Sequence, residues 1–211
     1  INKEISILIG LTLVTVMIIF TIIMINSIKT KIIKDLEINL QSQAGDYLQT
    51  TKIYNDSLEE NALVLFDVFQ KSFLNLRMRG TDTVKINGVE TLLLYDGFAR
   101  LNKTYDRVDR FKELTGQVSA VYVKDKNQYI NISSSILDEK GERILVNEID
   151  PNGQTYKKIE NKEKYVGLEK IAGKTYMSIY SPIVKNDKII GALYIGYDFT
   201  KGLEILKKEL K

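Results

Sequence analysis

The hydrophobic pattern of the chain begins with one continuous apolar run. Residues Ile5 to Ile25 contain no charged side chain. As a helix, such a run rises about 1.5 Å per residue and spans roughly 30 Å, which is the thickness of a bilayer core. The apolar region of a signal peptide is shorter, and no small-residue cleavage pattern follows at Asn26-Ser27-Ile28. We therefore predict a transmembrane helix over residues 5–25.

After this run, apolar residues recur in steps of three and four, with polar residues between them. The series contains Ile28, Ile32, Leu36, Leu40, Tyr47, Leu48, Leu58, Ala62, Leu65, Phe69, Phe73 and Leu76. This period is typical of an amphipathic helix, and we predict one extracytoplasmic helix over residues 26–79. A helix of this length usually needs a partner. We expect a parallel homodimer through this helix near the membrane, and packing on its own domain beyond it.

The pattern changes at Gly80. Asn87-Gly88 separates two alternating runs and predicts a hairpin. The spacing of Tyr105, Val108, Phe111 and Leu114 predicts a short helix that stops at Gly116. A period of two then predicts strands over residues 118–123, 128–134, 165–171, 175–184 and 188–197. Residues 138–163 form a looser stretch, and residues 201–211 are predicted as a helix that leads to a missing second membrane span.

These elements predict an α+β fold: a long N-terminal helix that continues a transmembrane span, then an antiparallel sheet of about five strands with flanking helices. We assign residues 80–200 to this domain. One face of the sheet is expected to form a ligand pocket together with the loop between the second and third strands.

Composition excludes several classes of chemistry. The chain has no cysteine and no histidine, which excludes thiolate or imidazole zinc sites, a Ser-His-Asp triad and a thiol nucleophile. No phosphate-binding loop, dinucleotide fingerprint or catalytic carboxylate pair stands out, and the acidic residues around Gly141 do not match a calcium loop. A net charge of +3 without a basic stripe argues against nucleic-acid binding. We therefore expect no enzyme activity, no cofactor and no metal.

Tyrosine and small polar residues alternate on two of the predicted strands. Tyr176, Ser178 and Tyr180 share one strand face, where rings would form apolar walls and hydroxyls would orient a polar ligand. The alternative is a tyrosine-rich cross-strand cluster without a ligand. Arg143 follows a turn, where it would either clamp an anion or remain solvated. The predicted ligand-binding residues are Tyr122, Tyr129, Asn131, Ser133, Arg143, Tyr165, Tyr176, Ser178 and Tyr180.

Short strings in the second half of the chain carry a family resemblance over Thr83 to Phe199. They are V-D-R-F-K-E-L-T-G (Val108 to Gly116), V-S-A-V-Y-V (Val118 to Val123), Gly141-Glu142-Arg143, Y-V-G (Tyr165 to Gly167), Y-M-S-I-Y-S-P-I (Tyr176 to Ile183) and I-I-G-A-L-Y-I-G (Ile189 to Gly196). In order and spacing they resemble the Cache family of extracellular sensor domains, and most of all the single-Cache group described as a Cache 3/Cache 2 fusion. The last two strings in combination are the most specific.

The resemblance implies a PAS-like sheet with a pocket for a small organic ligand, often a short carboxylate. It also implies a place outside the cytoplasmic (inner) membrane, in the periplasm or extracellular space, most often within a methyl-accepting chemotaxis protein. Asn131 stands where relatives tend to carry arginine, and Val146-Asn147 replaces a usual Gly-Thr, so both departures weigh against a carboxylate. In some other Cache domains an aspartate at the position of Asp198 contacts a ligand amine; a helix N-cap is the alternative.

We therefore predict the sensing module of a chemotaxis receptor that signals by ligand-biased helix displacement. The alternatives are the sensor of a histidine kinase or diguanylate cyclase, and a structural or adhesion domain without a ligand. Lys29, Lys31 and Lys34 follow the predicted span, and the positive-inside rule alone would place the domain in the cytoplasm. Because long domains translocate largely regardless of charge, the family resemblance decides the orientation that we predict.

Overall fold

The computed structural model describes residues 3–86, 88–138, 140–145 and 149–200. The chain forms two compact units, Ile1–Ile53 and Tyr54–Lys211, and each is described by itself. The helix predicted at residues 201–211 lies outside the described residues.

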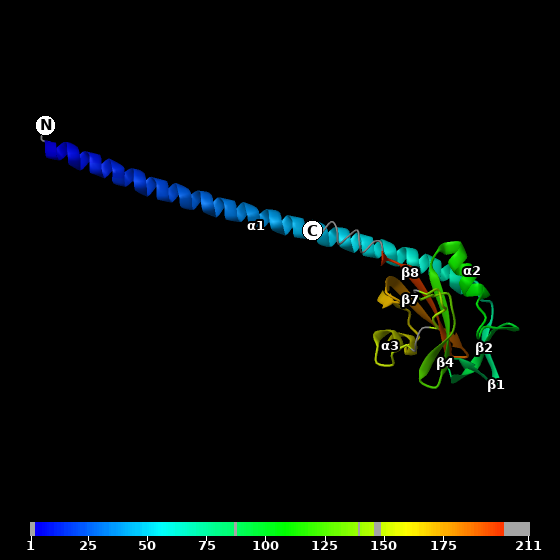
Figure 1. Cartoon of the computed structure of the whole chain (residues 1–211). Coiled ribbons are helices and arrows are strands. Elements are labelled where there is room, and N and C mark those ends of the chain that lie inside the picture. The colour runs from blue at the N-terminus through cyan, green and yellow to red at the C-terminus, as the bar shows by residue number, and fades with distance from the viewer. Residues whose placement is uncertain (1–2, 87, 139, 146–148, 201–211) are drawn as a thin grey trace. The chain divides into compact units, whose positions relative to one another are not determined.

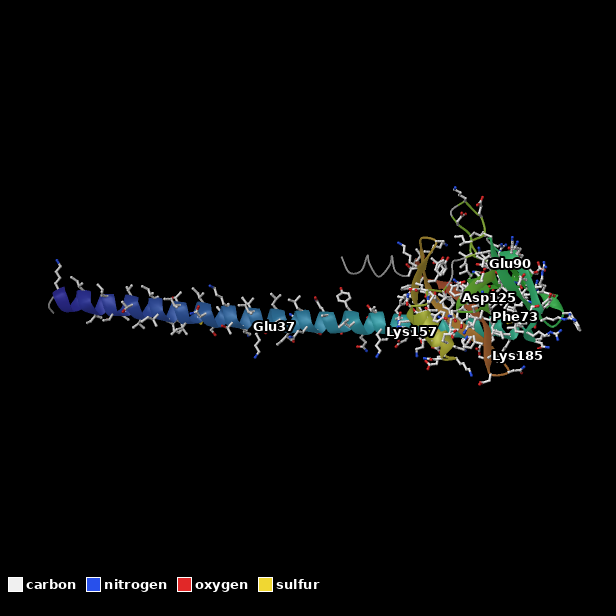
Figure 2. The ribbon with its side chains drawn as sticks, turned by 90° about the horizontal axis from the view of Figure 1, so that it is seen from below. Glu37, Phe73, Glu90, Asp125, Lys157 and Lys185 are labelled. Carbon is white, nitrogen blue, oxygen red and sulfur yellow. The ribbon has the colours of Figure 1, made fainter. Side chains whose placement is uncertain are left out.

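The first unit consists of the greater part of α1, which runs over Lys3–Lys71. Every side chain described in residues 3–53 is exposed, and Glu37 projects from the helix in this way in Figure 2. The hydroxyl groups of Thr12 and Thr21 donate to the carbonyls of Ile9 and Met17, both at 2.8 Å, so these polar groups are satisfied within the helix. By length and composition, α1 is able to cross a membrane, as the apolar run predicts.

The last turns of α1 belong to the second unit and end earlier than predicted. Leu58, Ala62 and Phe69 are buried, as the helical spacing indicates, while Phe66 is buried in addition and the predicted Leu65 is half-buried. The helix stops at Lys71, whereas the apolar pattern predicts helix to residue 79, so this part of the prediction is wrong. Phe73 and Leu76 still pack against the core, but they do so from a loop and a strand, which explains why their spacing misleads.

A distant carboxylate supplies the physical reason for this helix end. The Asp96 carboxylate accepts the backbone N–H groups of Leu74 at 3.0 Å and of Asn75 at 2.5 Å. These groups would otherwise continue the helical hydrogen-bond ladder. The chain therefore turns and enters a strand.

A small antiparallel sheet follows, with the order β1-β2-β3. Its strands are β1 (Leu76–Ile86), β2 (Val89–Asp96) and β3 (Ala99–Arg100). The predicted hairpin is confirmed, because Ile86 pairs with Val89. The predicted break at Gly80 is an irregularity within β1, where the pairing register shifts between Met78 and Thr83 and Gly80 adopts a φ of 66°.

The main sheet has five antiparallel strands in the order β5-β4-β8-β7-β6. They are β4 (Val118–Asp125), β5 (Gln128–Ser134), β6 (Tyr165–Ile171), β7 (Lys174–Lys185) and β8 (Lys188–Asp198). Two short helices flank it, α2 (Asp106–Thr115) and α3 (Gln154–Glu160), on opposite sides of the strands in Figure 1. The predicted α+β fold is confirmed, while α3 is a helix that the sequence pattern does not predict.

Each face of the main sheet has its own core. One face packs against α1, α2 and the small sheet, through Phe66, Phe69, Leu94 and Phe111 among others. The opposite face is rich in tyrosine and is covered by Ile159 of α3 and by the preceding segment, which contributes Ile136 and Ile149. We call this second face the tyrosine face.

Candidate functional site

Antiparallel pairing aligns the side chains of the tyrosine face in rows across strands β6, β7 and β8, because residues directly opposite each other point to the same side. Three successive rows are Glu169–Tyr176–Asp198, Gly167–Ser178–Gly196 and Tyr165–Tyr180–Tyr194. The middle row carries two glycines and a serine. A methyl group on Gly167 would overlap the hydroxyl of Tyr165, and one on Gly196 would overlap the hydroxyl of Tyr194. The phenol groups of the third row therefore lie over the small residues of the second.

This arrangement gathers oxygen atoms beside the first row. Tyr180 Oη donates to Glu169 Oε2 at 3.0 Å, and Thr155 Oγ1 of α3 donates to Glu169 Oε1 at 3.2 Å. Ser178 Oγ and Tyr194 Oη lie 3.4 Å apart, within hydrogen-bond distance. The result is a cluster of phenol, hydroxyl and carboxylate oxygens on one face of the sheet.

Aromatic rings surround these oxygens. The ring centroid of Tyr180 lies 4.7 Å from that of Tyr194, 6.0 Å from that of Tyr122 and 6.2 Å from that of Tyr165. All three pairs are tilted, an arrangement that aromatic side chains favour. The rings therefore give the site apolar walls, as expected for a small-molecule site.

Asn131 lies on β5, directly opposite Tyr122 of β4. Its side chain is buried, with 3% of the residue exposed, and neither amide atom has a hydrogen-bond partner in the part of the chain that the structure describes. An unpaired buried polar group costs about 1–3 kcal/mol, so most are satisfied by protein, water or ligand. Asn131 is thus a candidate to bind a polar group on the tyrosine face.

A pocket of about 270 Å³ opens at one end of this face. Its lining includes Tyr176 and Asp198 of the first row, so the pocket adjoins the oxygen cluster. The other lining residues are Lys112, Gly116, Val118, Leu137, Asp138, Ala172 and Lys174. The volume lies just below the range of drug-sized sites and suits a small solute.

Burial keeps the phenols of this face protonated. Desolvation raises the pKa of Tyr122, Tyr165, Tyr176, Tyr180 and Tyr194 above the ordinary tyrosine value. The negative charge of Glu169 raises the pKa of Tyr122 further, while a hydrogen bond with the side chain of Tyr180 opposes that rise. Each hydroxyl can therefore both donate and accept a hydrogen bond at neutral pH.

The Asp198 carboxylate is bound by other groups of the protein. Its Oδ2 lies 2.9 Å from Lys174 Nζ, and its Oδ1 accepts the backbone N–H of Thr200 at 3.0 Å. Burial raises the pKa of Asp198, but these partners outweigh it and hold the pKa below the usual range. The contact with Thr200 is of the N-cap type, one of the two roles that the sequence leaves open.

The structure brings six of the nine predicted residues onto the tyrosine face near one another, which are Tyr122, Asn131, Tyr165, Tyr176, Ser178 and Tyr180. Tyr129 also belongs to this face but is engaged at its edge. Its hydroxyl donates to Glu160, which pairs with Lys124 at 2.6 Å, and its ring lies 5.6 Å from that of Tyr156.

Ser133 and Arg143 lie apart from the cluster. A bulge between Val121 and Tyr122 breaks the alternation of β5, so Ser133 pairs with Val121 and donates to the carbonyl of Thr104 at 2.7 Å. Both terminal nitrogens of Arg143 donate to the Asp109 carboxylate at 2.8 Å, and the guanidinium lies 4.1 Å from the ring centroid of Tyr105. Within the described residues, no hydrogen bond or ring contact joins Ser133 or Arg143 to a phenol of the tyrosine face.

Sequence reasoning missed Tyr194, Glu169 and the two glycines of the middle row. A signal for Tyr194 exists, because alternation along β8 places it on the same face as Ala192 and Gly196. The role of Glu169 becomes visible once the register of β6 against β7 sets it opposite Tyr176. Among the described residues, no group of three or more acidic side chains is placed to hold a metal ion.

Acid is expected to weaken the domain in part through Glu160. Burial raises the pKa of Glu160, but the Lys124 ammonium and the Tyr129 hydroxyl outweigh it, so the pKa is lowered. Such a carboxyl stabilises the fold above its unfolded-state pKa of about 4.3, and the contribution is lost as the pH falls through its lower folded-state pKa. Melting temperatures between about pH 7 and pH 3 should therefore fall less steeply in Glu160→Gln than in the wild type.

The matched control for this titration is Glu113→Gln, which replaces an exposed carboxylate on α2. Its melting curve is expected to follow that of the wild type across the same pH range. Parallel curves for Glu160→Gln and the wild type would contradict the role assigned to Glu160.

The fold defines a class of protein: an α+β domain built on a five-stranded antiparallel sheet, preceded by a helix able to span a membrane. The sequence model of the Cache 3/Cache 2 fusion domain matches residues 25–211, and the chain belongs to this family. This match confirms the family resemblance of the sequence. Cache domains are extracellular modules that sense small molecules, and they are not catalytic.

Other comparisons add little. No curated protein sequence matches the chain. Among solved structures, the chain is similar to the GAF domain from Acinetobacter phosphoenolpyruvate-protein phosphotransferase, at 18% identity over 52% of this chain and 76% of that one, with a TM-score of 0.34. A likeness at that level says nothing about function.

Proposed function

We propose that the chain is the sensing part of a membrane receptor, of the type found in methyl-accepting chemotaxis proteins, and that it binds a small organic ligand on the tyrosine face. Residues 5–25 anchor it in the cytoplasmic membrane, and the domain over residues 80–200 lies in the periplasm or outside the cell. The observation that carries this proposal is the cluster of phenol and carboxylate oxygens beside a pocket of about 270 Å³.

The proposed signal passes from the sheet to α1. Phe199 directly follows β8, and its ring centroid lies 5.7 Å from that of Tyr54 on α1. Leu58 and Phe66 of the same helix share a core with Ile179 and Ile195 of the sheet. A ligand that prefers one arrangement of β8 and α1 over another shifts their populations, and only this difference in affinity can move the helix.

We also propose that two copies of the chain pair through α1. Ile33, Leu40 and Tyr47 follow one another at intervals of seven residues and are 64%, 58% and 49% exposed. A seven-residue apolar repeat is the pattern of a coiled coil, in which a second helix covers the stripe.

The test of ligand binding uses the full chain in lipid nanodiscs and a thermal-shift screen of small carboxylates, amino acids and amines. A ligand that binds the folded state alone stabilises it by about 2.7 kcal/mol at ~100 times its Kd, which raises the melting temperature by several degrees. In Tyr180→Phe we expect the ligand affinity to fall by about 10-fold, because the ligand loses the hydrogen bond that the Tyr180 hydroxyl is proposed to make with it.

Tyr197→Phe is the matched control, since Tyr197 lies on β8 and packs on the opposite core. It should leave the affinity unchanged. A screen without any shift in a well-folded protein, across all three classes of compound, would contradict the proposed function.

A further inference from the structure

A second hollow in the surface lies between the end of α1 and the helix α2. Its volume is about 290 Å³, and its lining residues are Val68, Phe69, Ser72, Arg107, Arg110, Phe111 and Leu114. None of them lines the pocket of about 270 Å³ beside the tyrosine face. We infer that this hollow, which we call the α1–α2 groove, is a second binding site and that it takes an aromatic carboxylate. The inference goes beyond the proposed function, because it concerns a different site.

The spacing of residues along the two helices builds the groove. The four residues that α2 contributes follow one another at offsets of three, four and seven, so they share one helix face. Phe69 of α1 and Phe111 of α2 are both buried, and their ring centroids lie 5.0 Å apart, so they form the floor. Val68 and Leu114 line the groove but remain 55% and 73% exposed. The groove is therefore apolar and open to solvent.

Two guanidinium groups line the groove, and they differ in their partners. Arg107 is held in place, because its Nη2 lies 2.6 Å from Asp96 Oδ2 and its Nη1 donates to the carbonyl of Ser72. Arg110 is exposed and forms no hydrogen bond, ion pair or ring contact within the residues that the structure describes. The described lining contains no carboxylate. The Arg110 guanidinium is thus the group that a ligand anion meets, and its planar fork can bind a carboxylate through two parallel hydrogen bonds.

The apolar walls determine the rest of the ligand. An apolar cavity of about 150 Å³ holds one benzene molecule, so the groove has room for one ring and a short acidic chain. The rings of Phe69 and Phe111 are tilted by 55°, an arrangement that a third ring can extend. An ammonium group would meet two like charges, and a small acid without a ring would leave the apolar walls in water. An aromatic carboxylate satisfies both the charge and the walls.

The first experiment separates the contributions of charge and ring. The full chain in nanodiscs is titrated at pH 7 by isothermal titration calorimetry, with the heats in empty nanodiscs subtracted. The panel contains 3-phenylpropionate, its neutral analogue 3-phenyl-1-propanol, its cationic analogue 3-phenylpropylamine, and propionate as the acid without a ring. We expect 3-phenylpropionate to bind at least about 10-fold more tightly than each of the others. A smaller margin, or no binding of 3-phenylpropionate up to about 10 mM, would overturn the inference and leave the proposed function standing.

Variants locate the site of binding. Arg110→Gln should weaken 3-phenylpropionate binding by about 10-fold, and Leu114→Gln by a few-fold, with the ligand-free melting temperature retained because both side chains are exposed. Arg79→Gln is the matched control, since it changes an exposed arginine on β1, and the affinity should not change. Lys112 lines the pocket beside the tyrosine face. Undiminished binding in Arg110→Gln, or a larger loss in Lys112→Gln than in Arg110→Gln, would place the acid outside the groove and overturn the inference.

A single thiol tests whether a second copy of the chain covers the groove instead. The chain has no cysteine, so Leu114→Cys carries the only thiol, at an exposed position. A maleimide should label this thiol in the full chain in nanodiscs, and 3-phenylpropionate should slow the labelling. Disulfide-linked pairs of chains that form under mild oxidation to the same extent with and without the acid would show that a second chain lies over the groove. That result, or labelling that the acid does not slow, would overturn the inference.

Discussion

Replacing Asp96 by alanine is expected to lower the free energy of unfolding of the second unit by about 3 kcal/mol. The Asp96 side chain is 2% exposed and its Oδ2 lies 2.6 Å from Arg107 Nη2. Its other oxygen accepts the N–H groups of Leu74 and Asn75, which follow the end of α1. The alanine variant leaves these donors and Arg107 without their acceptor. The measurement is urea unfolding followed by the near-ultraviolet circular dichroism of tyrosine.

Two further variants sharpen this result. Asp96→Asn keeps one oxygen acceptor and loses the charge, so its loss of stability should lie between those of the wild type and Asp96→Ala. Asp67→Ala removes an exposed aspartate on α1, where alanine is a good helix former, and the unfolding midpoint should stay close to that of the wild type. Equal midpoints for Asp96→Ala and the wild type would show that the end of α1 does not depend on this carboxylate.

Local signals were sufficient to predict most strands and the helix α2. Gln128–Ser134 and Tyr165–Ile171 begin and end at the predicted residues, because clear turn residues bound each strand in the sequence. Gly116 ends α2 as predicted and adopts a φ of 74°, and its N–H donates to the carbonyl of Lys112. A glycine there avoids the strain that a side chain would meet in the left-handed region.

Features that depend on distant partners were beyond local reasoning. Asp96, whose carboxylate accepts the N–H of Leu74 at the end of α1, lies 22 residues after Leu74 in the sequence. Asp109, which binds Arg143, lies 34 residues before it. The short helix α3 buries Ile159 but is too short to show a helical period in the sequence. No periodicity in the sequence reports such contacts.

The residues of the candidate site also fall into two groups: those placed by the alternation of one strand, and those placed by the pairing between strands. Alternation along β7 correctly places Tyr176, Ser178 and Tyr180 on one face. It fails at Ser133, because one bulge in the pairing of β4 with β5 moves that residue out of the alternation. The row of small residues beneath the phenols depends on the register of three strands, which the pattern of one strand does not contain.

Replacing Phe69 by alanine is expected to lower the free energy of unfolding by about 3–5 kcal/mol, which is the usual cost of removing a buried ring. Phe69 is 1% exposed, and its ring centroid lies 5.1 Å from that of Phe73 and 5.0 Å from that of Phe111. The ring thus joins α1 to α2 and to the core on one face of the sheet. The alanine leaves a cavity that the surrounding helices and sheet can close incompletely. Urea unfolding of the full chain in nanodiscs gives the measurement.

The matched control is Val68→Ala, one residue away on the same helix, where the side chain is 55% exposed. We expect its stability to change by less than about 1 kcal/mol, since an exposed valine contributes little packing and alanine is a good helix former. If the proposed signalling route through α1 holds, ligand affinity should also change more in Phe69→Ala than in Val68→Ala, because a loosened helix no longer distinguishes the two arrangements. Equal losses of stability in the two variants would show that α1 does not dock on the sheet through this buried side.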